Sequence, residues 1–274
     1  MLLPAGMSPP LSLALGGLTM PGDVRQRIAL AASLGFRAVH LNLTGDGLRP
    51  RELGRSARRD LAALLRRHEL GFSGVDLWIP PGHFIDPSHA DRALAAAVDA
   101  IRFTAEIGSL MSGETPALSL ELPGSSVPQS LERTLTEEAG GAGVRIADHT
   151  WPPRDRSTGT PADRAPLAVG IDPAAVFLAA ASADKEKSGG EAWLGSPARA
   201  AAHLGGRLAS ARLSDIGSAG RVAPGEGRLD ILAYLAALST ASYQGSLVLD
   251  VRNVLRQEEV CRKVVDDLGG RTNS

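Results

Sequence analysis

Short apolar runs alternate with longer segments of helical periodicity along nearly the whole chain. Turn-forming residues bound each apolar run, which is typical of buried strands. The predicted strands are Leu11–Leu15, Ala38–Leu43, Gly71–Leu77, Ala117–Leu122, Val144–Asp148, Leu167–Ile171, Leu208–Ser214 and Ser246–Val251. Regular alternation of strand and helix predicts βα units and a parallel sheet. Eight such strands predict an α/β fold of the (β/α)8 TIM-barrel type.

The segments between the strands carry an apolar face and end signals of helices. Ile28, Ala31 and Leu34 recur on one face of a helix predicted over Asp23–Leu34, and Gly35 ends it. Further helices are predicted at Ala57–His68, Ser88–Ile107 and Leu255–Leu268, and two more begin near Asp172 and Asp230, whose carboxylates can cap exposed N–H groups.

Two segments break the alternation. His149 to Pro166 is rich in Pro, Arg, Thr, Asp and Gly without a helical period, so we expect the fifth helix to be missing or vestigial. Residues 150–166 and 183–191 are expected to be irregular loops, and residues 1–10 a short leader before the first strand. Neither loop is long enough to be a domain, so residues 1–274 are predicted to form a single barrel domain.

Composition limits the class of partner. Hydrophobic residues make up 43% of the chain and charged residues 22%, which is ordinary globular usage. The 29 basic and 30 acidic residues give a formal net charge of −1, so composition favours neither nucleic acid nor an anionic membrane as a partner. A small molecule bound at a local site is therefore expected.

Cysteine usage and hydropathy suggest the compartment. Cys261 is the only cysteine, so the chain can form no internal disulfide, which fits a reducing cytoplasm. No window approaches the roughly 18 consecutive apolar residues of a membrane span. We expect a soluble cytoplasmic protein.

The candidate site lies where the strands end. In a TIM barrel the C-terminal ends of the strands and the loops that follow form one mouth. The polar residues at these ends are Asn42, Asp76, Glu121, Asp148, His149, Asp172, Arg212, Asp215 and Asp250. Asp172 can cap the next helix, serve the site, or do both. Only one of the neighbours Asp148 and His149 can point into the barrel.

Several loop residues are candidates for substrate binding. His83 in IPPGHFIDP could bind a phosphate or orient a hydroxyl, or be a solvated loop residue. Gly225 and Gly227 in PGEGRLD could cradle a phosphate, or only shape their own turn. Trp78 could cover a sugar face or pack the loop. Glu121 and His149 complete the predicted substrate-binding set.

The ordered motifs resemble a known family. SARLSD, PGEGRLDILAYLAAL and SYQGSLVLD follow one another as in the sugar-phosphate isomerase/epimerase group of xylose isomerase-like barrels. Upstream, GFRAVHLNL, RRDLAALLRRHEL, IPPGHFIDP, VRIAD and VGIDPAAV are similar as well. The resemblance covers about the whole chain, and the order of these loose motifs carries it.

That resemblance implies one divalent metal, Mn²⁺, Mg²⁺ or Zn²⁺, held by Glu, Asp, His and Glu on the fifth to eighth strands. Asp148, Asp172, Arg212 and Asp250 stand at these positions. Only Asp172 matches outright, two carboxylates are shorter, and a guanidinium cannot ligate a cation. The metal site, with Asp172, Asp148 and Asp250 as ligands, is therefore either kept in altered form or replaced by Arg212.

The resemblance further implies proton transfer next to a carbonyl of a sugar or polyol. Asp148 and Asp250 would then be the bases, and a metal or Arg212 would polarise the carbonyl oxygen. The alternative is a barrel that has lost its chemistry and serves as a binding or structural module. The DNA-repair branch of the superfamily is disfavoured because the chain lacks its histidine-rich metal sites and basic surface.

Overall fold

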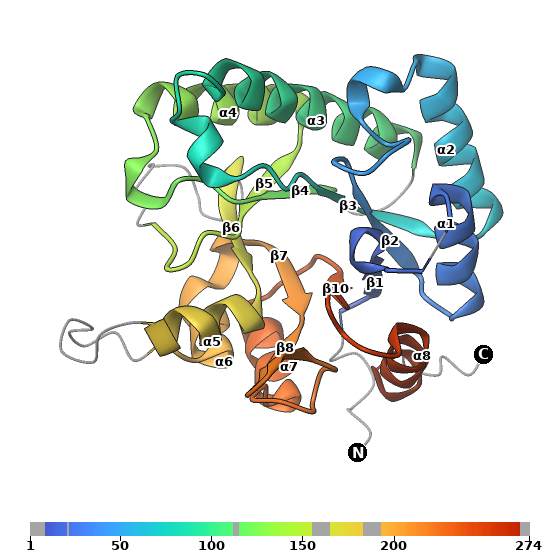
Figure 1. Cartoon of the computed structure of the whole chain (residues 1–274), viewed down its shortest axis with the longest axis vertical. Helices are drawn as coiled ribbons and strands as arrows, with labels where there is room; N and C mark the ends of the chain where they lie inside the picture. The colour runs from blue at the N-terminus through green and yellow to red at the C-terminus, as the bar shows by residue number, and fades with distance from the viewer. Residues whose placement is uncertain (1–8, 21, 112–114, 155–164, 183–192, 269–274) are drawn as a thin grey trace.

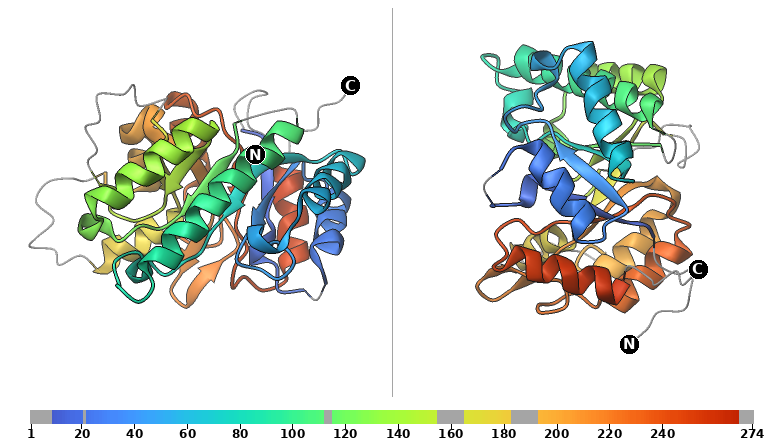
Figure 2. Two further views of the ribbon diagram at one scale, coloured as in Figure 1. Left: turned by 90° about the horizontal axis from the view of Figure 1, so that it is seen from above. Right: turned by 90° about the vertical axis from the view of Figure 1, so that its right-hand side faces the viewer.

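The computed structural model describes residues 9–20, 22–111, 115–154, 165–182 and 193–268. Its centre is a closed barrel of parallel strands in the order β1-β10-β7-β6-β5-β4-β3-β2. Helices lie around the strands, and α3 and α4 pack side by side on one flank (Figures 1 and 2). The predicted TIM barrel is confirmed.

All the predicted strands form, with ends that differ by at most two residues. The barrel strands are β1 (Leu11–Ala14), β2 (Ala38–Asn42), β3 (Gly71–Asp76), β4 (Ala117–Leu120), β5 (Arg145–Asp148), β6 (Leu167–Ile171), β7 (Leu208–Leu213) and β10 (Leu247–Leu249). An antiparallel hairpin, β8 (Asp215–Gly217) with β9 (Gly220–Val222), follows β7 and was not predicted from the sequence.

The helices follow the predicted pattern. They are α1 (Val24–Ser33), α2 (Arg55–Arg67), α3 (Ala90–Leu110), α4 (Gln129–Ala142), α5 (Pro173–Ser182), α6 (Pro197–Leu204), α7 (Ile231–Thr240) and α8 (Gln257–Leu268). Short 3-10 turns are η1 (Leu15–Gly17), η2 (Pro50–Glu52), η3 (Pro81–Phe84), η4 (Gly124–Ser126) and η6 (Gly205–Arg207). Among the described residues, no helix is both long and apolar enough to cross a bilayer.

The predicted irregular segments fall largely on undescribed residues. Between β5 and β6, the described residues 149–154 and 165–166 contain no helix, and residues 155–164 lie outside the described part. The loop predicted at 183–191 lies wholly outside it, as do residues 1–8 of the predicted leader. Two helices, α5 and α6, stand between β6 and β7.

The two faces of the sheet differ in character. Strand residues that face the helices are apolar and fully buried, such as Leu41, Val75 and Leu118. The interior of the barrel instead contains buried polar side chains, among them Ser12, His40, Ser73, Asp76, Ser119, Ser210 and Arg212. Because buried polar groups are costly unless they bond to one another, this interior must form a connected network.

Gly74 allows β3 and β4 to approach closely. Its φ is +141°, and a Cβ built there would lie 2.0 Å from the carbonyl oxygen of Ala117 on β4. Only glycine fits at this point of the barrel wall, next to the register shift between β2 and β3.

We expect Gly74→Ala to lower the free energy of unfolding by about 2 to 4 kcal/mol, because a side chain must push the strands apart in a backbone region it disfavours. Urea denaturation measures this. Gly82→Ala is the matched control, because nothing lies within 4 Å of a Cβ at Gly82. Equal effects of the two substitutions would contradict this account.

Candidate functional site at the mouth of the barrel

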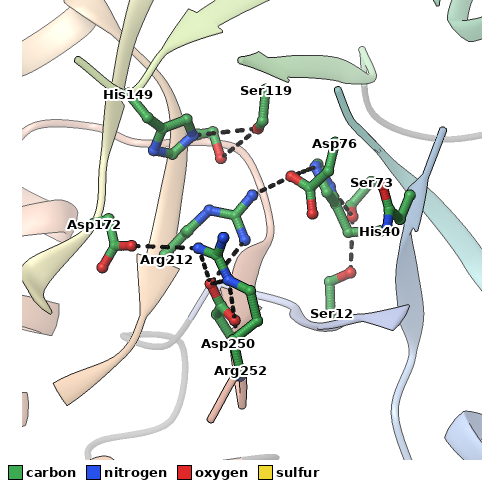
Figure 3. A network of polar contacts seen from close by, with 12 residues as sticks. Ser12, His40, Ser73, Asp76, Ser119, His149, Asp172, Arg212, Asp250 and Arg252 are labelled. Atoms are coloured by element: carbon green, nitrogen blue, oxygen red, sulfur yellow. Dashed lines mark hydrogen bonds and ion pairs between the residues drawn. The ribbon is translucent and has the colours of Figure 1, made fainter. Parts of the chain in front are cut away.

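Arg212 spans the barrel from one wall to the other. It projects inward from β7, its side chain is 0% exposed, and its guanidinium bonds Asp76 on β3. The strands β7 and β3 are four places apart in the closed order, so they face each other across the interior. Arg212 Nη1 also donates to Asp250 Oδ2 on the loop after β10 at 3.4 Å (Figure 3). One guanidinium therefore connects three parts of the barrel.

Small residues leave room for this side chain. Ser119 on β4 and Ser210 on β7 face the interior, where Ser119 Oγ donates to Ser210 Oγ at 3.4 Å. Their register partners on β5 and β6 are Ala147 and Gly170. A larger side chain at any of these positions would compete with Arg212 for the same volume.

Asp76 is bound from two sides. Besides Arg212, it contacts His40, whose Nε2 lies 3.3 Å from Asp76 Oδ1. His40 Nδ1 in turn lies 3.2 Å from Ser73 Oγ, and the Ser73 and Ser12 hydroxyls are 2.7 Å apart. Burial opposes ionisation of Asp76, but the charges of Arg212 and His40 outweigh it and hold the pKa well below its usual range. Asp76 is thus a permanent anion.

Two further arginines cover the other aspartates at the mouth. Arg252 Nε donates to Asp250 Oδ1 at 3.0 Å and to Oδ2 at 2.9 Å, and its Nη2 lies 2.6 Å from Oδ2. Arg221, carried by the β8–β9 hairpin, donates from Nη2 to Asp172 Oδ2 at 2.6 Å. It also reaches Asp250, with Nη1 3.7 Å from Oδ2. Both oxygens of Asp250 are therefore engaged by guanidinium groups.

Asp172 serves the network and the helix at once. Its Oδ1 accepts from the backbone N–H of Ala174 at the start of α5 at 3.0 Å and from the Ser214 hydroxyl. Burial opposes ionisation, but Arg221 and the Ser214 hydrogen bond hold its pKa well below its usual range. Of the readings open from the sequence, the combined one fits this geometry.

Trp78 packs against the arginines. The guanidinium carbons of Arg212 and Arg252 lie 5.1 and 4.6 Å from its ring centroid. Cations at this distance from an indole ring are attracted by its electron-rich face. The predicted role of Trp78 in covering a sugar stays a prediction, and its contacts here are with the arginines.

Asp148 does not share the interior with Arg212. Its neighbour Ala147 pairs in register with the inward Ser119, so alternation along β5 directs Asp148 toward the helices. Asp148 Oδ1 accepts from the backbone N–H groups of Leu122 at 3.2 Å and Thr150 at 3.0 Å. This carboxylate fastens the loops after β4 and β5, a position ill suited to the base or metal ligand expected from the sequence.

His149 takes the inward position at the end of β5. Its ring lies against Gly170, where an added Cβ would overlap it, and Nε2 lies 3.2 Å from Ser119 Oγ. Burial and the charge of Arg212 lower its pKa to about 3, so the imidazole is neutral at physiological pH. Within the described residues its buried Nδ1 has no hydrogen-bond partner, which leaves that atom for a ligand or a water molecule.

Glu121 is an acidic residue at the mouth that takes no part in these ion pairs. Three guanidinium groups, of Arg212, Arg221 and Arg252, face three buried aspartates, and the described part of the chain gives Glu121 no hydrogen bond or ion pair. Glu121 is half-buried. Burial raises the pKa of its carboxyl. The positive charge of Arg252 lowers this pKa, and the negative charge of Asp172 raises it. Burial therefore makes this carboxyl hold its proton more readily than a solvated glutamate does.

Hydrogen bonds to the Asp215 carboxylate hold the glycine loop, residues 224–230, in place. Asp215 Oδ2 accepts from the backbone N–H groups of Gly225 at 3.0 Å and Gly227 at 2.9 Å. Asp215 Oδ1 accepts from those of Arg228 and Leu229. The amide donors that a phosphate would use are thus bound to an internal carboxylate, and the geometry favours the reading that the glycines shape their own turn.

His83 lies apart from Arg212. Its ring stacks on that of His89, with centroids 4.4 Å apart and an angle of 15° between the planes. Both rings line a separate cavity on the flank of the barrel.

Sequence reasoning missed part of the site. Arg221 and Arg252 were not chosen, and His40 was assigned no function. Arg252 could have been recognised from the sequence, because it stands two residues after Asp250 beyond a strand end. Arg221 could not, because only the unpredicted hairpin brings it to Asp172.

The donor set does not fit a divalent metal. Arg212 holds Asp76 and Asp250, and Arg221 holds Asp172, so a cation there would have to displace guanidinium groups and approach their positive charge. Within the described ranges, no group of three or more His, Cys, Asp or Glu side chains is arranged to hold a metal ion.

Removing Arg212 should be costly. We expect Arg212→Met to lower the free energy of unfolding by about 3 to 5 kcal/mol, because Asp76 and Asp250 would lose a buried partner. Adding Asp76→Asn to this variant should restore part of the loss, since it removes one uncompensated charge. Denaturant unfolding tests both, with Arg133→Met on the exposed side of α4 as the control. A loss below about 1 kcal/mol would contradict the view that the buried ion pairs of Arg212 across the barrel stabilise the fold.

The neutral His149 gives a pH dependence. Its pKa falls from 6.5 to about 3 on folding, so the unfolded chain binds the extra proton, and stability is lost as pH falls below 6.5. Between about pH 6.5 and 5 this amounts to roughly 2 kcal/mol. We expect His149→Gln to flatten the pH dependence of the melting temperature in that window. The same change at the exposed His203 should leave it unaltered.

Comparisons with known proteins agree with this architecture. A family model described as xylose isomerase-like TIM barrel matches residues 28–266. A xylose isomerase domain protein from Planctomyces limnophilus has a similar structure, with a TM-score of 0.69, 16% identity, and 96% of this chain and 97% of that one covered. Searching curated proteins finds no significant match.

Two other solved structures bear the names of enzymes. D-psicose 3-epimerase from Clostridium cellulolyticum H10 has a TM-score of 0.61 and 15% identity, with 94% of this chain and 90% of that one covered. The probable 3-DHS dehydratase AsbF from Bacillus anthracis has a TM-score of 0.65 and 10% identity, with 95% and 99% covered. Such low identities show the fold alone. Because the family model spans most of the sequence, the chain belongs to the xylose isomerase-like TIM barrel family.

Proposed function

We propose that this protein is an isomerase- or epimerase-like enzyme that moves a proton next to the carbonyl of a sugar without a metal. The observation that carries the proposal is Glu121, a half-buried carboxyl of raised pKa, without a partner in the described part of the chain and close enough to Arg252 to feel its charge. Raising the pKa of a carboxyl above its usual range makes the group a better proton donor and acceptor for general acid–base catalysis.

Arg252 supplies the complementary group. Its Nε and Nη2 are held by Asp250, while its Nη1 has no partner among the described residues. Asp250 raises its pKa against the effect of burial, so the guanidinium stays charged. A fixed cation with a free N–H donor can stabilise negative charge that develops on a carbonyl oxygen. This is the task that the sequence-based hypothesis gave to a metal or Arg212.

The proposed step balances without an external reactant. Ionised Glu121 takes the proton from the carbon next to the carbonyl, and the electrons of that C–H bond form an enediolate whose oxygen is bound by Arg252. The hydroxyl proton of the neighbouring carbon passes to the former carbonyl oxygen, and protonated Glu121 returns its proton to the former carbonyl carbon. A new carbonyl thereby forms on the neighbouring carbon, which interconverts aldose and ketose. Glu121 replaces the bases predicted from the sequence, because Asp250 is saturated by guanidinium groups and Asp148 fastens two loops.

The test is proton exchange in D₂O with a panel of aldoses and ketoses, followed by NMR. We expect exchange with at least one sugar, a loss of at least about 100-fold in Glu121→Gln, and no loss with EDTA. Asp148→Asn is the matched control, because that carboxyl lies beside the mouth but serves the loops. Exchange that survives Glu121→Gln, or that requires an added divalent cation, would overturn the proposal.

A second candidate is a barrel that binds a sugar or polyol without reacting it. The observation in its favour is the saturation of Asp76, Asp172 and Asp250 by guanidinium groups. In that case panel sugars would raise the melting temperature, while none would exchange its proton.

A further inference from the structure

A cavity of about 740 Å³ lies on the flank of the barrel, outside the Arg212 network. The loops after β2 and β3 and the first half of α3 form its walls. Leu43 and Leu77, which follow the inward Asn42 and Asp76, line its inner side, so the cavity lies between the sheet and α3. Its volume is in the range of small-molecule sites.

Arginines line this cavity. Arg51 and Arg92 are exposed and have no ion-pair partner within the described residues. Arg49 also lines it but is paired with Asp46 at 3.1 Å and Glu52 at 3.2 Å. Two guanidinium groups therefore remain for a ligand.

A carboxylate also lines the cavity. Asp99 lines it seven residues after Arg92 on α3, which places the two about 10 Å apart along the helix axis. A ligand that lies along α3 would meet positive charge at one end and a carboxylate at the other.

The other lining residues suit an organic molecule. The stacked rings of His83 and His89 form a flat surface, and Asp86 Oδ2 fixes His89 through Nδ1 at 2.9 Å. Leu77, Ile79 and Ala93 supply apolar contacts. An inorganic ion would leave most of this volume and apolar surface unused.

We propose that this flank cavity binds a small organic anion, a carboxylate or a phosphate ester with an apolar or planar body. The anionic group pairs with Arg92 and is attracted by the charge of Arg51, the body packs on the His83–His89 stack, and a hydroxyl or ammonium group points to Asp99. This site is separate from the mouth and does not depend on the proposed proton transfer.

The test is calorimetric titration of the full-length chain with phenyl phosphate and with benzoate, which separate phosphate from carboxylate recognition. We expect one of them to bind, and its affinity to fall about tenfold in the double variant Arg51→Gln/Arg92→Gln. Neither probe carries a hydroxyl or ammonium group for Asp99, so Asp99→Asn should strengthen binding of the same probe about twofold by removing a negative charge that repels the anion. The opposite signs distinguish a charge effect at this cavity from unfolding.

Matched control variants test whether the probe binds at this cavity. Arg133→Gln on α4 and Asp91→Asn on α3 change exposed charges outside the lining and should leave the affinity unchanged. Imidazole NMR signals of His83 and His89 should shift on binding, and the Glu121→Gln variant should bind as well as the unaltered chain. Failure of both probes to bind at millimolar concentration, or equal affinities in the Arg51→Gln/Arg92→Gln and Arg133→Gln variants, would overturn the proposal.

Discussion

The ion pair that Arg212 makes across the barrel is the constraint on which the mouth depends. A fully buried guanidinium joins β7 to Asp76 on the opposite wall and to Asp250 on the loop after β10. A charge there is tolerable only because carboxylates surround it and because small interior residues give it room. The positions of His149, Trp78 and Arg252 follow from this side chain, since each packs against it or against its partners.

Charge balance then determines the protonation states of groups at the mouth. Arg212 and Arg221 lower the pKa values of Asp76 and Asp172, which keeps both ionised, while the histidine after β5 is kept neutral. Glu121 lies outside this pairing, and burial raises the pKa of its carboxyl. The guanidinium groups of Arg212, Arg221 and Arg252 present positive charge at the mouth. That charge acts through hydrogen bonds of fixed direction, because a guanidinium donates and cannot accept.

Backbone elements after β7 show how distant residues are brought to the mouth. The β8–β9 hairpin turns the chain back so that Arg221 meets Asp172. Asp215 gathers the N–H groups of the glycine loop, including those of Gly225 and Gly227, and so fixes the path from the hairpin to α7. The glycines in this loop allow the turn that brings its N–H groups to Asp215. Because these donors are bound to Asp215, the loop geometry does not favour a phosphate site.

The sequence by itself determined the barrel, the order of its strands and the set of polar residues at their ends. Apolar runs and capping residues are local signals, and eight of them in alternation leave few other folds. It also marked Arg212 as the residue that puts a metal in doubt. Only the tertiary structure decided which of Asp148 and His149 faces the interior, because that depends on register with Ser119. Likewise, the pairing of each aspartate with its arginine, the isolation of Glu121 and the cavity beside α3 arise from segments far apart in the chain. Local patterns cannot specify such contacts, since they depend on how the closed barrel brings its strands together.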